Sequence, residues 1–100
     1  MGPTPELHQE SRHIQYYLLV KAANEEAARD VAESAVSTAG VDPVPVVSAV
    51  TPHEGGNDLW KAVCISEREI DDHLSRVEES QVSRDGARLM FYRKLYIRLE

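Results

Sequence analysis

The sequence lacks several features that would narrow the class of protein. It has one cysteine, Cys64, so it forms no internal disulfide, which favours a reducing, cytoplasmic setting. No apolar run approaches the roughly 18 residues of a membrane span. Residues 1–12 have no hydrophobic core of the kind found in a secretory signal. We therefore expect a cytoplasmic protein of 100 residues, without a membrane partner, whose core needs no cross-link.

Motifs for catalysis, cofactor binding and metal binding are also missing. The histidines lack the i, i+4 spacing of a helical zinc site. Gly55-Gly56 precedes an expected strand rather than a helix, so we interpret it as a turn and not as a phosphate loop. Cys64 lies in an expected central strand, which favours a buried small side chain over a nucleophile. The sequence predicts no catalytic, cofactor or metal site.

Charge is plentiful and unevenly distributed. The net charge of the chain is −6. The segment 84–100 has five basic and two acidic residues, a net of +3, so residues 1–83 carry −9. An acidic body repels nucleic-acid phosphates, and a nucleic-acid partner is therefore not expected.

Hydrophobic periodicity predicts six elements after a flexible tail at 1–12. Apolar alternation or β-branched runs predict strands at 14–20, 44–50, 59–65 and 88–99. An alanine-rich stripe predicts a helix at 24–39 with Asn24 as its N-cap. A capping box formed by Ser66 and Glu69 predicts the start of a second helix. A C-terminal helix is the alternative for 88–99, since its apolar residues also recur at i+4.

This order of elements predicts one α+β domain over 13–100. Its fold is a ferredoxin-like βαββαβ sandwich: a four-stranded antiparallel sheet of order 4-1-3-2 with two helices on one face. Pro45 cannot donate to a ladder, which suits an edge strand. The other face of the sheet is left open to water or to a partner.

Strand parity predicts an aromatic surface on that open face. If Leu18 and Phe91 face the helices, the opposite parity puts aromatic residues of three strands outside. These are Tyr17, Trp60, Tyr92 and Tyr96. Exposed aromatic residues at this density favour a contact with another protein or with a second copy of the chain. The alternatives are an error in the parity of the third strand and cover by the tail.

The second helix predicts an acidic patch. Its residues are Glu67, Asp71, Asp72, Glu78 and Glu79. One interpretation is a solvated face, and the other is a surface that docks on a basic protein. In size and composition the chain resembles small acidic viral inhibitors of nucleic-acid machinery.

We therefore expect a non-enzymatic protein–protein interaction or inhibitor module. A first alternative is a small-molecule-binding regulatory domain that acts as a dimer, since ACT-like domains share the topology. A second is an RNA-binding sheet platform, because RRM domains stack bases on aromatic residues of the same sheet. An enzyme of the dimeric α+β barrel type is a third, although the inward positions are mostly apolar. Fold alone licenses none of these functions.

Overall fold

Six elements follow one another in the computed structural model, which describes residues 13–80 and 86–96. They are β1 (Ile14–Lys21), α2 (Glu25–Ser37), β2 (Val46–Pro52), β3 (Leu59–Ser66), α3 (Asp71–Ser80) and β4 (Arg88–Tyr96). The predicted tail at 1–12 and the predicted end of the last strand at 97–99 lie outside the described residues. The strand prediction for the C-terminal segment is confirmed over 88–96, and the helix alternative is wrong there.

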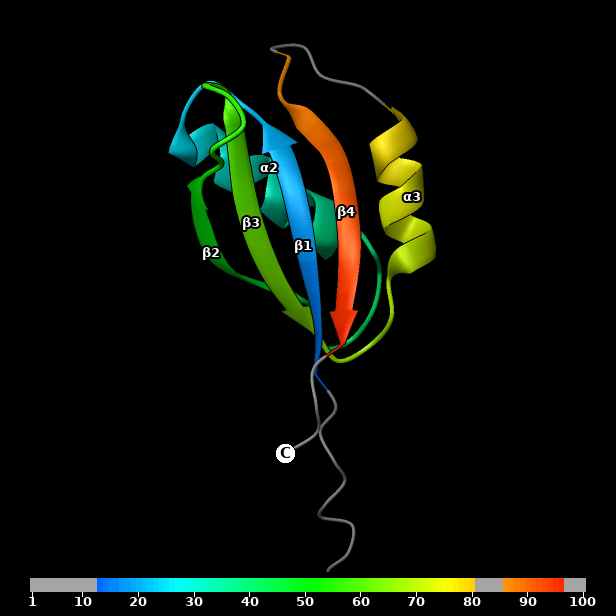
Figure 1. Ribbon diagram of the computed structural model, residues 1–100. Coiled ribbons are helices and arrows are strands. Elements are labelled where there is room, and N and C mark those ends of the chain that lie inside the picture. Colours follow the sequence, from blue (N-terminus) through cyan, green and yellow to red (C-terminus); the bar gives the residue numbers. More distant parts are fainter. Residues whose placement is uncertain (1–12, 81–85, 97–100) are drawn as a thin grey trace, which may run out of the picture.

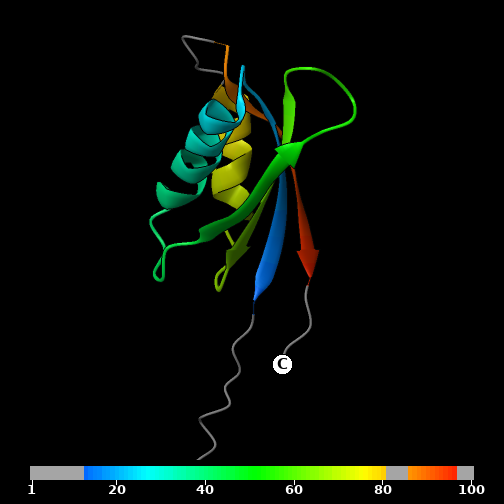
Figure 2. The same ribbon diagram turned by 90° about the vertical axis from the view of Figure 1, so that its left-hand side faces the viewer.

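The strands form one antiparallel sheet with the predicted topology. Its order is β2-β3-β1-β4, which is 4-1-3-2 when read from the other edge. Both helices lie on the same side of this sheet, and the described residues leave its other side without a helix (Figures 1 and 2). The predicted α+β, ferredoxin-like sandwich is therefore confirmed.

Helix α2 packs closely because its inner face is built from alanine. Asn24 caps the helix, and its side-chain oxygen accepts a hydrogen bond from Ala27 N at 2.8 Å. Ala28, Ala32 and Ala35 are buried against the sheet. Small side chains let the helix axis come near the strands. The large side chains that fill the core therefore come mainly from the strands.

Strands β2 and β3 form a hairpin at one edge of the sheet, joined by the turn that the sequence predicted at Gly55-Gly56. His53 N donates to Leu59 O at 2.9 Å and closes the loop that contains Gly55 and Gly56. Pro45 lies just before β2, which is an edge strand as predicted. Ser48 is an extra residue in β2, because Val47 pairs with Cys64 and Ala49 with Val63.

Helix α3 begins later than the sequence predicted. Its first residue is Asp71, and Leu74 N donates to Ile70 O at 3.0 Å. Ser66 does not cap the helix: its hydroxyl instead accepts from Arg68 N and donates to Arg68 O. The hydroxyl closes a local turn, which competes with the helix for these residues. Leu74 is the one fully buried residue of α3, so this helix covers the core by a single ridge.

Strand β1 supplies the centre of the core with the parity that its sequence predicted. Ile14, Tyr16, Leu18 and Val20 are buried, and the residues between them are half-buried. Directly opposite residues of antiparallel strands point to the same face, so the register of β1 decides which residues of β3 and β4 face the helices.

Candidate functional site

The open face of the sheet is a regular lattice of side chains. The strand register places its residues in three rows that run from β2 across β3 and β1 to β4. The first row contains Thr51, Lys61, Leu19 and Phe91; the second contains Ala49, Val63, Tyr17 and Arg93; the third contains Val46, Ile65, Gln15 and Leu95. Lys21 opposes Arg88 beyond the first row, near the hairpin end of the sheet.

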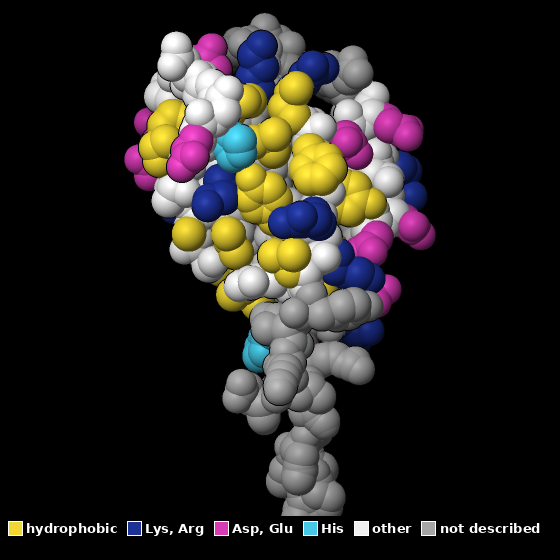
Figure 3. Space-filling model, in the orientation of Figure 1, with side chains coloured by type: hydrophobic (Ala, Val, Ile, Leu, Met, Phe, Trp, Pro, Cys, Tyr) yellow, Lys and Arg dark blue, Asp and Glu magenta, His cyan; other side chains and the backbone are white. Residues whose placement is uncertain are grey.

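A diagonal apolar stripe crosses these rows. It contains Phe91, Leu19, Tyr17, Val63, Ile65 and Val46, and each is next to another member along a row or along a strand. Val46 is 61% and Phe91 44% exposed, while the four between them are half-buried. Figure 3 shows hydrophobic side chains gathered over the strands, with Lys and Arg among them. Large apolar surfaces of this kind are typical of contact sites.

The predicted aromatic surface is only partly right. Tyr17 lies on the open face, but Trp60 pairs with Val20 and Tyr92 with Leu18, so both point to the helix side. Trp60 Nε1 donates to Ala22 O at 3.1 Å. The hydroxyl of Tyr92 lies 3.3 Å from that of Ser75 on α3. Tyr96 pairs with Ile14 through the backbone, and its side chain lies outside the described part of the structure.

The error in parity has a physical cause on each strand. Both faces of β3 are apolar, so alternation alone does not choose between Ala62 with Cys64 and Val63 with Ile65. Ala62 and Cys64 are fully buried, because small residues suit the close approach of α2. On β4 the polar side chains of α3 favour Tyr92 and Lys94 as inward neighbours, and Phe91 lies outside. The sequence reasoning therefore missed the stripe residues Val46, Val63, Ile65 and Phe91, whereas Leu19 lies on the open face that its parity predicted.

Charge is separated between the two sides of the fold. The four strands contain five Lys or Arg residues and no Asp or Glu. In contrast, α2 and α3 each carry four acidic residues and one basic residue. Of the strand cations, Lys94 lies on the helix side and the other four are on the open face. The open face formed by the described strands is therefore positive, although the chain as a whole is acidic.

Lys61 and Arg93 stand on opposite sides of the apolar stripe. Lys61 is paired with Leu19, and Arg93 with Tyr17, whose ring centroid lies 5.8 Å from the Arg93 guanidinium carbon. This cation–π contact holds the charge over the stripe. Neither cation forms an ion pair with a carboxylate of the described residues.

The predicted acidic patch divides into two sets. Asp71 is engaged inside the fold: it accepts a hydrogen bond from the Tyr16 hydroxyl at 2.5 Å, and Lys94 Nζ lies 3.0 Å from its other oxygen. Lys94 Nζ also lies 3.3 Å from Glu69. The others, Glu67, Asp72, Glu78 and Glu79, form no ion pair among the described residues. Glu67 precedes α3, so the patch is not one helix face.

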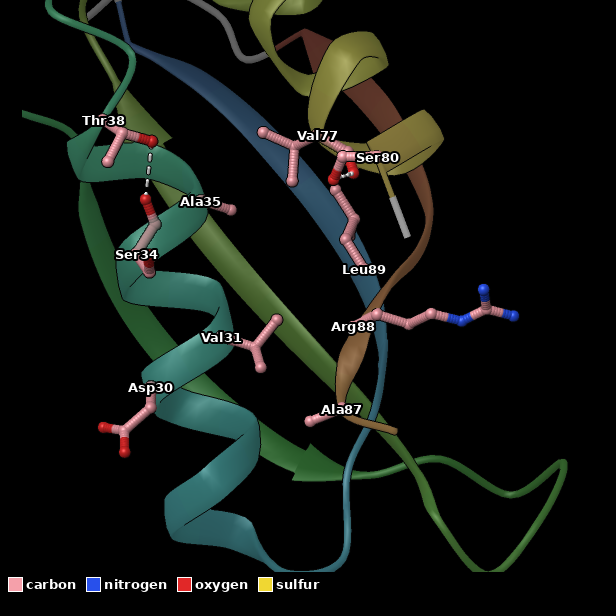
Figure 4. A pocket seen from close by; sticks show the side chains of 10 residues that line it. All are labelled: Asp30, Val31, Ser34, Ala35, Thr38, Val77, Ser80, Ala87, Arg88 and Leu89. Carbon is pink, nitrogen blue, oxygen red and sulfur yellow. Dashed lines mark hydrogen bonds between the residues drawn. The ribbon is translucent and has the colours of Figure 1, made fainter. Parts of the chain in front are cut away.

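A shallow groove lies between α2, α3 and β4. Its volume is about 340 Å³, and apolar side chains form its floor. Val31, Val77 and Leu89 project into it, whereas Asp30 and the guanidinium of Arg88 point away (Figure 4). Of the polar residues that line the groove, Thr38 and Ser80 donate their hydroxyl hydrogens to backbone carbonyls of α2 and α3, so they give a ligand little fixed orientation.

The structure agrees with the interpretation of Cys64 as a core residue. The side chain is buried, and this burial raises the pKa of the thiol to about 11. A thiol in this state is a poor nucleophile. Within residues 13–80 and 86–96, no three His, Cys, Asp or Glu side chains gather into a group that could hold a metal ion.

Comparison with protein-family models, with curated proteins and with solved structures gives no match to this chain. None of the helices in the described part of the chain is long and apolar enough to cross a membrane.

Proposed function

We propose that the protein is a non-enzymatic interaction module that binds another protein through the open face of its sheet. The observation that carries this proposal is the diagonal apolar stripe. Its ends, Val46 and Phe91, keep 61% and 44% of their surface in water, although large apolar side chains gain about 25 cal/mol for each Å² that they bury. A partner that covers the stripe gains this free energy.

The acidic residues of α3 are a less favoured contact surface. Two carboxylates of this region, Glu69 and Asp71, already pair with Lys94. The remaining carboxylates surround no exposed apolar centre on α3, where Leu74 is buried. Exposed charges alone contribute little affinity, so they suit the border of an interface better than its centre.

An RNA-binding platform is the second candidate, and the positive charge of the open face favours it. Its weakness is the composition of the stripe. Bases stack on aromatic rings, and only Tyr17 and Phe91 of the six stripe residues have one. The four aliphatic members suit a protein surface better.

The test compares capture of partners by two variants with equal numbers of substitutions. Val46→Ser with Phe91→Ser removes the exposed ends of the stripe. Asp72→Asn with Glu79→Gln changes exposed carboxylates on the helix side. Both should keep the circular dichroism of the wild type, because exposed positions change stability by about 0.5 kcal/mol or less.

Affinity capture from the source cells, quantified by mass spectrometry, should then give a protein that the wild type and the α3 variant retain and the stripe variant loses. Sedimentation velocity applies the same comparison to a second copy as the partner. Equal capture and equal sedimentation by all three proteins would contradict the proposal.

A further inference from the structure

The apolar stripe of the open face has the length and width of one side of an α-helix. The stripe spans three spacings between strands and two spacings between rows. Each of these two distances is roughly 14 Å, so the stripe is about 20 Å long on its diagonal. At 1.5 Å per residue, a helix of about 13 residues has this length. The stripe is one side chain or two wide along its course, which matches the narrow apolar face of an amphipathic helix.

Lys61 and Arg93 are about as far apart as the two sides of such a helix. Lys61 and Arg93 are two strands and one row apart, so their Cα atoms are separated by about 12 Å. The line between them crosses the stripe at close to a right angle. A helix with its side chains is about 10–12 Å in diameter. Each cation would therefore meet one border of a helix that lies along the stripe.

From this geometry we infer that the open face binds an amphipathic helix of three to four turns whose apolar side is bordered by Asp or Glu on both flanks. The inference rests on the proposed function and specifies its partner. The described strands place four cations and no anion on this face, so a helix with acidic flanks is attracted and one with basic flanks is repelled. Helix-in-groove recognition reads the partner through residues at i, i+3, i+4 and i+7.

The described helices of a second copy do not supply this partner. The apolar face of α3 is closed on its own sheet, where Leu74 is fully buried. The same holds for α2, whose buried residues are alanines and Val36. A face-to-face pair of sheets would bring cationic surfaces together. The occupant is therefore a helix of a different protein.

The experiment uses the full chain and a display library of helical peptides. Each peptide has about 14 residues, with Leu at i, i+3, i+4 and i+7 spacing and with Glu, Lys or Gln at random elsewhere. Selection on the wild type should enrich Glu over Lys at the positions that flank the Leu stripe, by about tenfold or more after several rounds, because every round repeats the preference of the cationic face for an acidic flank.

Two variants with the same change in charge make the test specific. Lys61→Glu with Arg93→Glu reverses the cations beside the stripe and should reverse the selection to Lys. Lys21→Glu with Arg88→Glu reverses the two cations beyond the first row and should weaken the enrichment of Glu without reversing it. Selection of Glu and Lys in equal amounts, an equal effect of both variants, or failure to enrich any peptide would overturn the inference.

The outcomes separate this inference from the proposed function. Suppose that Val46→Ser with Phe91→Ser abolishes partner capture but Lys61→Glu with Arg93→Glu does not. The open face is then still the binding surface, but its partner is not a helix with acidic flanks. A fluorescent single-stranded RNA of random sequence provides the other arm. RNA binding near 150 mM salt that Lys61→Glu with Arg93→Glu abolishes would overturn the inference in favour of a nucleic-acid partner.

Discussion

At the scale of single residues, the hydroxyl of Tyr16 is the polar group on which the core depends. The residue is fully buried, and its hydroxyl donates to Asp71 at 2.5 Å and accepts from Ile70 N at 2.9 Å. A buried polar group costs free energy unless it is hydrogen-bonded, and here both bonds join β1 to the start of α3. This tyrosine therefore positions the helix as well as filling space.

Removing this hydroxyl should destabilise the fold while preserving its shape. Tyr16→Phe leaves Ile70 N–H without its partner and Asp71 with one fewer, so we expect a loss of about 1–3 kcal/mol in the free energy of unfolding. Urea denaturation followed by circular dichroism measures it. The control is Tyr17→Phe on the open face, which should stay within about 0.5 kcal/mol. Equal stability of the two variants would show that the buried hydroxyl contributes nothing.

The same residue gives a dependence on alkaline pH. Burial and the hydrogen bond to Asp71 raise the pKa of Tyr16 above its ordinary value. The folded state therefore keeps the proton that the unfolded state loses, so this contribution is complete below about pH 10 and is lost as pH rises further. The urea midpoint should fall as pH rises above about 10, and it should fall less in Tyr16→Phe. Parallel declines in the two proteins would refute the assignment.

Cys64 should be chemically silent in the folded protein. Because its pKa is raised to about 11, only about one thiol in a thousand is ionised at pH 8, and the side chain is buried. A disulfide reagent such as dithiobis(nitrobenzoate) should label the native chain slowly, at a rate set by unfolding. It should label the chain unfolded in 6 M guanidinium at once. Stoichiometric labelling of the native chain within seconds would contradict the burial.

At the scale of elements, the sequence was sufficient for the order of strands and helices but not for the orientation of every strand. In β1 the polar residues Gln15 and Lys21 alternate with the buried ones and support the predicted parity, although both faces are apolar in the middle of the strand. For β3 and β4 both faces carry apolar residues, and the choice depends on neighbours far away in the chain. Cys64 and Lys94 both pair with Tyr16, so the face that they occupy follows from the register. Where both faces of a strand are apolar, as in β3 and β4, the local periodicity does not fix the register.

Helix α3 should be the element that detaches most easily. Leu74 is its one fully buried residue, so Leu74→Ala removes its main apolar anchor and should cost about 2–5 kcal/mol. Val77→Ala, at a half-buried position of the same helix, should cost less. Hydrogen exchange should show faster exchange of α3 amides than of β1 amides in Leu74→Ala. Uniform acceleration across both elements would instead indicate that α3 opens only with the whole fold.

At the scale of the whole molecule, the fold separates charge into two layers. The acidic residues of α2 and α3 lie on one side, and the cations of the strands lie mainly on the other. The net charge of −6 hides this arrangement, because an average over the chain carries no information on faces. A partner with acidic borders is attracted by the open face and repelled by the helix layer, so it can approach productively from one side.

The last prediction concerns the role of the α3 carboxylates that form no ion pair among the described residues. Reversing Asp72, Glu78 and Glu79 to Lys should leave the affinity for a partner on the open face within about threefold, because these residues lie on the opposite layer and exposed charges are screened over about 10 Å at 0.1 M salt. Asp71 is kept, since its contacts with Tyr16 and Lys94 hold the fold together.

The measurement is the association rate at rising salt for this variant and for Lys61→Glu with Arg93→Glu. Steering by the open face predicts a rate that falls with salt in the wild type and in the α3 variant, and a slow, weakly salt-dependent rate in the sheet variant. If the α3 variant alone loses binding, the acidic residues are the docking surface, and the module binds a basic partner through its helix layer.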